Sequence, residues 1–60
     1  MKQPEIGQIY RLNLNIGANR YLVMDVKLKK IKYRVYFTNV KSGQVGDMEL
    51  QEFNRNFKKE

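Results

Sequence analysis

The chain is dominated by an alternation of apolar and polar residues with a period of two, which is the pattern of half-buried β-strands. The clearest example covers residues 20–38, where the apolar positions are even numbered up to Leu28 and odd numbered from Ile31 onward. Lys29 and Lys30 separate the two phases. This change of phase predicts a β-hairpin that turns at Lys29 and Lys30.

The predicted hairpin register gathers apolar side chains on one face. The facing pairs on that face are Leu28 with Ile31, Val26 with Tyr33, Met24 with Val35, and Leu22 with Phe37. The outer face pairs Lys27 with Lys32, Asp25 with Arg34, Val23 with Tyr36, and Tyr21 with Thr38. A Lys-Lys dipeptide lacks the preference for positive φ of tight hairpin turns, so the loop can be two residues wider with the same residues facing inward.

A third strand is predicted after the hairpin. The stretch NVKSGQVGD, residues 39–47, contains the serine and glycine of a turn. In the resulting register Phe37 lies across from Met48 and Val35 lies across from Leu50. Val40 and Val45 fall on the opposite parity, which predicts a bulge or a strong twist near Asn39 and Gly46.

The two ends of the chain complete the expected fold. Residues 9–14 alternate as a strand, and residues 15–20 form a loop. The apolar positions of that strand are Tyr10, Leu12 and Leu14. Near the C-terminus Leu50, Phe53 and Phe57 are spaced by three and four residues, which predicts a helix of one or two turns. The aromatic residues expected in the core are Tyr10, Tyr33, Phe37, Phe53 and Phe57.

These elements predict a mainly β fold, a small barrel of four to five antiparallel strands with a short C-terminal helical turn, in one domain over residues 1–60. The layout resembles the SH3-like small barrels, a shape shared by Tudor, KOW and chromo-type modules. The stretches GQIYRL and GDMELQEF also resemble short proteins of bacteriophages and mobile elements of low-GC bacteria. The resemblance covers most of the chain and implies no particular activity, because this shape serves many functions.

The composition argues against an enzyme. Sixty residues bury only a thin core, and the chain has no cysteine and no histidine, so disulfides, thiolate metal sites and the commonest general base are absent. Ser42 is expected to be a turn residue. Asp47, Glu49 and Glu52 could be considered for Mg²⁺, but their spacing is not that of a metal-binding loop, and we expect solvated carboxylates. We predict no catalytic residue, no cofactor and no metal.

The sequence shows neither a signal peptide nor an apolar run long enough to span a bilayer. Its amino-terminal stretch MKQPEIGQ contains one lysine and no apolar segment. A cytoplasmic protein without a membrane partner is the expectation.

Positive charge is concentrated in one stretch. The net charge is +6, and KLKKIKYR, residues 27–34, contributes +5 of it. On the predicted hairpin these cations lie on the outer face or at the tip, together with two tyrosines. Cations attract phosphates and exposed aromatic rings stack on bases, so this surface predicts binding to DNA or RNA with weak sequence preference. The predicted nucleic-acid-binding residues are Tyr21, Lys27, Lys29, Lys30, Lys32, Arg34 and Tyr36.

Two other interpretations fit the same surface. A basic and aromatic patch also suits an acidic protein, for example a host protein bound by a phage or mobile-element factor. Alternatively, the lysines and arginines only keep one face of a half-buried sheet soluble. Self-association is a further possibility, because a barrel of few strands can leave an edge exposed.

Overall fold

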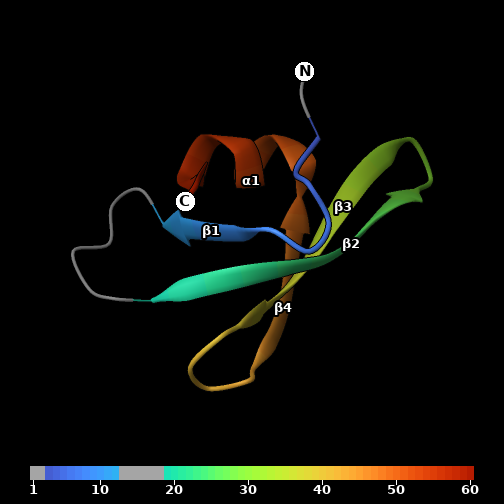
Figure 1. Ribbon diagram of the computed structural model, residues 1–60. Coiled ribbons are helices and arrows are strands. Elements are labelled where there is room, and N and C mark those ends of the chain that lie inside the picture. The colour runs from blue at the N-terminus through green and yellow to red at the C-terminus, as the bar shows by residue number, and fades with distance from the viewer. Residues whose placement is uncertain (1–2, 13–18) are drawn as a thin grey trace.

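The computed structural model describes residues 3–12 and 19–60. Its elements are β1 (Ile9–Leu12), β2 (Arg20–Lys29), β3 (Lys32–Asn39), β4 (Val45–Glu49), α1 (Leu50–Asn56) and β5 (Phe57–Lys59) (Figure 1). All five strands belong to one antiparallel sheet with the order β4-β3-β2-β1-β5. The predicted mainly β fold with a short C-terminal helix is therefore confirmed. Over the described ranges, however, the sheet stays open with β4 and β5 at its edges, so it is not a closed barrel.

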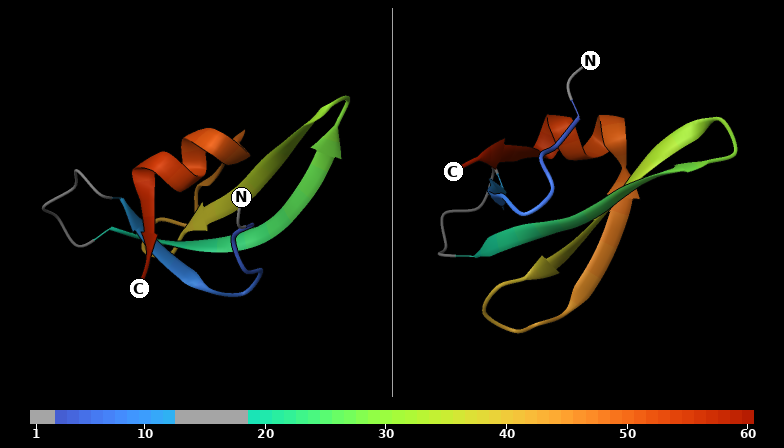
Figure 2. Two further views of the ribbon diagram at one scale, coloured as in Figure 1. Left: turned by 90° about the horizontal axis from the view of Figure 1, so that it is seen from above. Right: turned by 45° about the vertical axis from the view of Figure 1, so that its right-hand side comes forward.

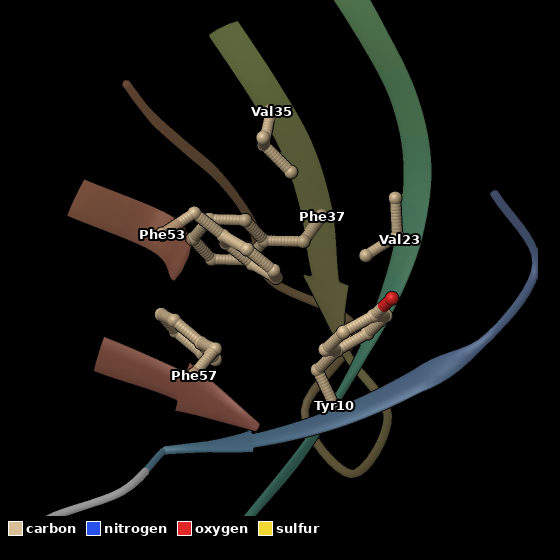
Figure 3. Close-up of a cluster of buried hydrophobic side chains, with 6 residues drawn as sticks. All are labelled: Tyr10, Val23, Val35, Phe37, Phe53 and Phe57. Carbon is tan, nitrogen blue, oxygen red and sulfur yellow. The ribbon is translucent and has the colours of Figure 1, made fainter. Parts of the chain in front are cut away.

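The core lies between α1 and one face of the curved sheet. Figure 3 shows the rings of Phe53 from α1 and Phe57 from β5 facing side chains of β1, β2 and β3. The buried residues of this core cluster are Tyr10, Val23, Val35, Phe37, Phe53 and Phe57. Phe53 is fully buried, and its ring stacks on Phe57 with centroids 4.4 Å apart. Four of the five aromatic residues predicted in the core are confirmed, whereas Tyr33 is 42% exposed.

A β-bulge at Met24 changes the parity of β2. Val23 pairs with Phe37 and Asp25 pairs with Tyr36, so Met24 has no partner on β3. The backbone N–H of Val26 donates a 2.8 Å hydrogen bond to the Asp25 carboxylate beside the bulge. As a result Val23 is buried and Met24 is 48% exposed.

The bulge makes the faces predicted for Leu22, Val23 and Met24 wrong, since Val23 was predicted to face outward and is buried. Leu22 and Met24 were expected to face inward, but Leu22 pairs with Thr38 on the opposite face. A bulge or a strong twist was predicted near Asn39 and Gly46, and the register between β3 and β4 shows no bulge among the residues that it pairs. A bulge adds one residue to one strand, and a smooth apolar alternation along that strand does not reveal the addition.

The far half of the hairpin keeps its predicted faces with a shifted register. The observed pairs are Val26 with Val35, Lys27 with Arg34, Leu28 with Tyr33, and Lys29 with Lys32. The turn therefore consists of Lys30 and Ile31, and Lys30 has a φ of 57°. The predicted turn at Lys29 and Lys30 and the predicted pair of Lys27 with Lys32 are wrong. Moving the turn by one residue changes each partner by two positions, which leaves the faces unchanged.

The pairing of β4 is also shifted by two residues from the prediction. Met48 lies across from Val35, and Gly46 lies across from Phe37. The shift arises because the turn is centred between Lys41 and Ser42, one residue earlier than predicted. The Asn39 side chain accepts hydrogen bonds there from the backbone N–H groups of both residues. At Gly46 an added Cβ would lie 3.0 Å from the Phe37 ring, so glycine allows the ring to pack directly on β4.

The ends of the chain agree with the prediction where they are described. Tyr10 is buried in β1, and its hydroxyl accepts a 2.9 Å hydrogen bond from the backbone N–H of Glu5. Leu14 and most of the loop predicted at residues 15–20 lie outside the described residues. The predicted helix is α1, and the chain then continues from Phe57 as β5 beside β1.

The tip of the β2–β3 hairpin projects from the rest of the molecule. We call residues 27–34 the arm and the remaining described residues the body. In Figures 1 and 2 the arm extends beyond the N-terminal end of α1 in every view. β4 ends at Glu49, opposite Arg34, so no strand of the described chain pairs with Lys32 or Tyr33 on that side.

Candidate nucleic-acid interface on the hairpin arm

Strand geometry places four cations on one face of the arm. Side chains alternate between the two faces of a strand, so Lys27 and Lys29 on β2 share a face with Lys32 and Arg34 on β3. Cross-strand neighbours on this face have like charge, since Lys27 lies opposite Arg34 and Lys29 lies opposite Lys32. Like charges directly opposite one another are destabilising. The predicted like-charge contact is thus present with different partners.

β4 adds carboxylates to the same face. Glu49 lies across from Arg34, and Asp47 lies across from Tyr36. The Arg34 guanidinium donates a hydrogen bond to Asp47, and this bond raises the pKa of Arg34 above its usual value. Lys32 Nζ lies 3.5 Å from a Glu49 oxygen. The face is therefore a mixture of charges over β3 and β4, which the charge count of the isolated stretch did not reveal.

The tip of the arm differs from this mixed face. Lys27 Nζ lies 3.8 Å from an Asp25 oxygen, so three of the five cations of the arm have a carboxylate neighbour. For Lys29 and Lys30 the described part of the chain offers no ion-pair partner. Both lysines are exposed. The uncompensated positive charge of the arm is therefore located at its outermost end.

The two tyrosines of the predicted surface lie on different faces. Tyr36 is half-buried on the cationic face, and Lys27 Nζ lies 5.6 Å from its ring centroid, within the range of a cation–π contact. Tyr21 lies before the bulge and packs edge-on against Phe37 and Phe57, with centroids 5.6 and 5.3 Å away. Tyr21 is thus separated from the lysines that it was predicted to accompany.

The opposite face of the arm is apolar and open. Leu28, Ile31 and Tyr33 were predicted to point into the core, and they are 57%, 88% and 42% exposed. A hollow of about 290 Å³ lies where the arm meets the start of α1. Its lining residues are Ile31, Lys32, Tyr33, Glu49, Leu50 and Gln51. The sequence contained one hint of this surface, because few apolar residues remain to cover the far end of the hairpin.

The carboxylates considered for a metal are engaged elsewhere or dispersed. Asp47 and Glu49 contact Arg34 and Lys32, while Glu52 lies in the first turn of α1. Within residues 3–12 and 19–60 there is no group of three metal-ligating side chains. Ser42 Oγ accepts a 3.3 Å hydrogen bond from the backbone N–H of Gln44, as expected of a turn residue. Among those same residues, no helix is long and apolar enough to cross a membrane.

Two ion pairs hold the last residues of the chain to other parts of the body. The Arg20 guanidinium donates hydrogen bonds of 2.6 to 3.2 Å to both carboxylate oxygens of Glu60. These bonds lower the pKa of Glu60 below its ordinary value. Lys59 Nζ lies 3.0 Å from a Glu5 oxygen. The positive charge of Lys59 is thus partly neutralised.

Comparisons of the chain with protein-family models, with curated proteins and with solved structures find no match. The resemblance to SH3-like barrels and to phage proteins therefore stays a prediction, as does self-association through the edge strands.

Proposed function

We propose that the protein binds nucleic acid through the arm, as a small cytoplasmic binding protein and not as an enzyme. The observation that supports this proposal is the position of Lys29 and Lys30, which are exposed, adjacent and without a carboxylate partner in the described chain at the end of a projecting hairpin. Lys32 lies across from Lys29 on β3, and Lys27 lies two residues before Lys29 on β2.

The strength of phosphate binding by a lysine depends on whether a nearby carboxylate already offsets the positive charge of that lysine. A lysine already beside a carboxylate contributes less to a polyanion complex, because the local carboxylate repels the phosphate that the lysine attracts. Within the described chain the two lysines of the tip form no ion pair with a carboxylate, although Glu49 lines the same shallow hollow as both of them. We therefore assign the principal phosphate contacts to Lys29 and Lys30, with Lys27 and Lys32 as secondary contacts.

A salt series tests the proposal. Binding to duplex DNA, single-stranded DNA and RNA is measured by fluorescence anisotropy between about 50 and 200 mM salt, the range over which phosphate contacts weaken strongly. We expect an affinity that falls linearly on a logarithmic scale as salt rises. Absence of binding to all three nucleic acids at low salt would remove the proposal.

Three double variants with equal net charge locate the contacts. They are Lys29→Gln with Lys30→Gln at the tip, Lys27→Gln with Lys32→Gln on the cationic face of the arm, and Lys41→Gln with Lys58→Gln on the body. We expect the tip pair to reduce the salt slope by about 2, since each lost phosphate contact lowers it by about 1. The second pair should have a smaller effect and the body pair almost none. Equal effects of the tip and body pairs would contradict the assignment.

A second candidate function is docking of an acidic protein. It is favoured by the exposed Leu28 and Tyr33 beside the hollow at the start of α1, because apolar side chains next to lysines suit an acidic segment with apolar anchors. The test is a pull-down from nuclease-treated bacterial lysate with the unsubstituted protein and with the double variant Leu28→Ser, Tyr33→Ser. One protein that survives nuclease and is lost with the variant would support docking.

A further inference from the structure

The turn of the arm contains two features that do not favour a stable hairpin. Ile31 is 88% exposed, the highest value among the large apolar side chains in the described ranges. Lys30 has a φ of 57°, in the left-handed region that glycine and asparagine occupy far more readily than lysine. Glycine in place of Lys30 would form this turn with less strain, because of the two turn residues only Lys30 has a positive φ. Local rules broken together at one place point to a site selected for function.

Exposure of one isoleucine would by itself mean little, because single apolar side chains are common on protein surfaces. Here the isoleucine occupies the end of a narrow projecting arm and has a lysine on each side, Lys30 and Lys32. Lys29 lies across the strand pair from Lys32. An apolar tip surrounded by cations combines a group that avoids water with groups that bind phosphates.

We propose that the arm enters the minor groove of duplex DNA and that Ile31 inserts between two base pairs as a wedge. Lys29, Lys30 and Lys32 then contact the phosphates on either side of the opened step. This inference rests on the proposed nucleic-acid binding and specifies its ligand. Apolar side chains that enter base steps from the minor groove are a known means by which proteins unstack and kink a duplex.

The dimensions of the arm are consistent with a wedge that deforms the DNA. The minor groove of B-form DNA is about 6 Å wide, and the two strands of the arm alone are about 4.8 Å apart before side chains are added. The arm therefore fits only a widened groove. Opening a base step bends the duplex toward the major groove and widens the minor groove. The exposed Leu28 and Tyr33 then lie where the sugar walls of the widened groove can cover them.

This mode of binding predicts a preference among nucleic acids. Pyrimidine–purine steps such as TA and CA unstack most easily, so a duplex with such a step at its centre should bind more tightly than a stiff A-tract. Single-stranded DNA has no groove to enter. RNA duplexes have a wide and shallow minor groove that does not enclose an arm. The preference would arise from deformability without hydrogen bonds to base edges.

The test is the bend angle of a duplex of about 20 base pairs with a fluorophore at each end and a central TA step, measured by energy transfer. The unsubstituted protein should kink it by about 20 to 90°. Ile31→Ser should remove most of the kink while leaving the salt slope unchanged, and Ile31→Leu should restore it. Val45→Ser, which removes an exposed β-branched side chain from the body, is the matched control and should bend the DNA normally.

The outcomes separate this inference from the proposed function. If Ile31→Ser bends the duplex as the unsubstituted protein does, or if the duplex is bound without bending, the wedge is wrong and phosphate binding by the arm stands. If Lys29→Gln with Lys30→Gln leaves affinity and salt slope unchanged, the proposed function is wrong as well. Circular dichroism of each variant, compared with that of Ile31→Leu, establishes that a lost kink does not reflect a lost fold.

Discussion

Val35 and Tyr33 are two residues apart on the same face of β3, yet Val35 is fully buried and Tyr33 is 42% exposed. Val35 belongs to the body, where the helix α1 covers the sheet, and Tyr33 belongs to the arm, which extends beyond the helix (Figure 1). Alternation along a strand therefore determines which face a side chain takes. Whether that face is buried depends on what other element reaches it.

The body and the arm also differ in how charge is compensated. On the body Glu60 and Glu5 contact Arg20 and Lys59. At the end of the arm, by contrast, no carboxylate of the described chain pairs with Lys29 or Lys30. The arm thus ends in two adjacent, exposed lysines that have no ion-pair partner in the described chain, and such a surface attracts a polyanion.

The largest expected difference between body and arm is in stability. Phe53→Ala removes a fully buried ring that contacts Tyr10, Phe37 and Phe57, and we expect a loss of about 3 to 5 kcal/mol in the free energy of unfolding. Tyr33→Ala in the arm should cost less than about 1 kcal/mol. Urea unfolding followed by far-UV circular dichroism measures both.

A loss of that size can unfold a 60-residue domain completely, because such domains are only marginally stable. Phe53→Leu serves as the milder body variant, with Tyr33→Leu as its partner in the arm. Equal destabilisation by the two leucine variants would show that the arm is packed as tightly as the body, contrary to the structure.

A substitution at Gly46 is expected to lower the stability of the fold by an intermediate amount. A methyl group there would come within 3.0 Å of the Phe37 ring, and overpacking of this kind costs about 1 to 3 kcal/mol. Gly46→Ala should therefore lower the thermal midpoint of unfolding. The comparison in the arm is Ile31→Ala, for which thermal melts should show almost no change. A neutral Gly46→Ala would mean that the ring of Phe37 moves freely.

A substitution at the turn of the arm is expected to raise the stability of the fold by a smaller amount. Lys30→Gly relieves a left-handed backbone conformation that costs a residue with a side chain about 1 to 2 kcal/mol, while glycine adds freedom to the unfolded chain. We expect a gain of up to about 1 kcal/mol in urea unfolding together with weaker DNA binding. A turn that becomes less stable would argue against strain at Lys30.

The smallest effect concerns the exposed ion pair of the body. Because Arg20 lowers the pKa of Glu60 in the folded state, the pair stabilises the fold above the ordinary pKa of about 4.5 and loses this contribution as the pH falls through the folded value. Glu60→Gln should therefore lower the thermal midpoint slightly at pH 7 and leave it unchanged near pH 2. A difference that persists at low pH would point to packing rather than charge.

Much of the fold could be predicted from the sequence because it depends on local pattern. The hairpin, the third strand, the short helix and the buried aromatic residues follow from periods of two and of 3.6 residues. Leu22 and Met24 could not be placed correctly, because the bulge that reverses their faces leaves the apolar alternation intact. Tyr21 was assigned to the cationic face for the same reason.

The cationic residues of the candidate site could be predicted from the sequence. The residues that surround these cations in the folded protein could not. Charge counting identified the arm, but the carboxylates of Asp47 and Glu49 reach Arg34 and Lys32 through strand pairing between β3 and β4. Leu28 and Ile31 are exposed because α1 does not extend over the arm, and the spacing of apolar residues in the sequence does not reveal how far the helix reaches. The carboxylate neighbours and the exposed apolar side chains are both consequences of tertiary structure. They are the reason why we expect the main nucleic-acid contact at the tip of the arm and not on its cationic face.

We propose above all that nucleic acid binds at the tip of the arm. The most direct test measures changes in the backbone amide chemical shifts of the protein during titration with a short DNA duplex. Two-dimensional NMR on ¹⁵N-labelled protein should show the largest changes at residues 28–33 and small changes in α1 and β5. Changes centred instead on the body near Arg11 and Arg20, or no changes at low salt, would contradict the account.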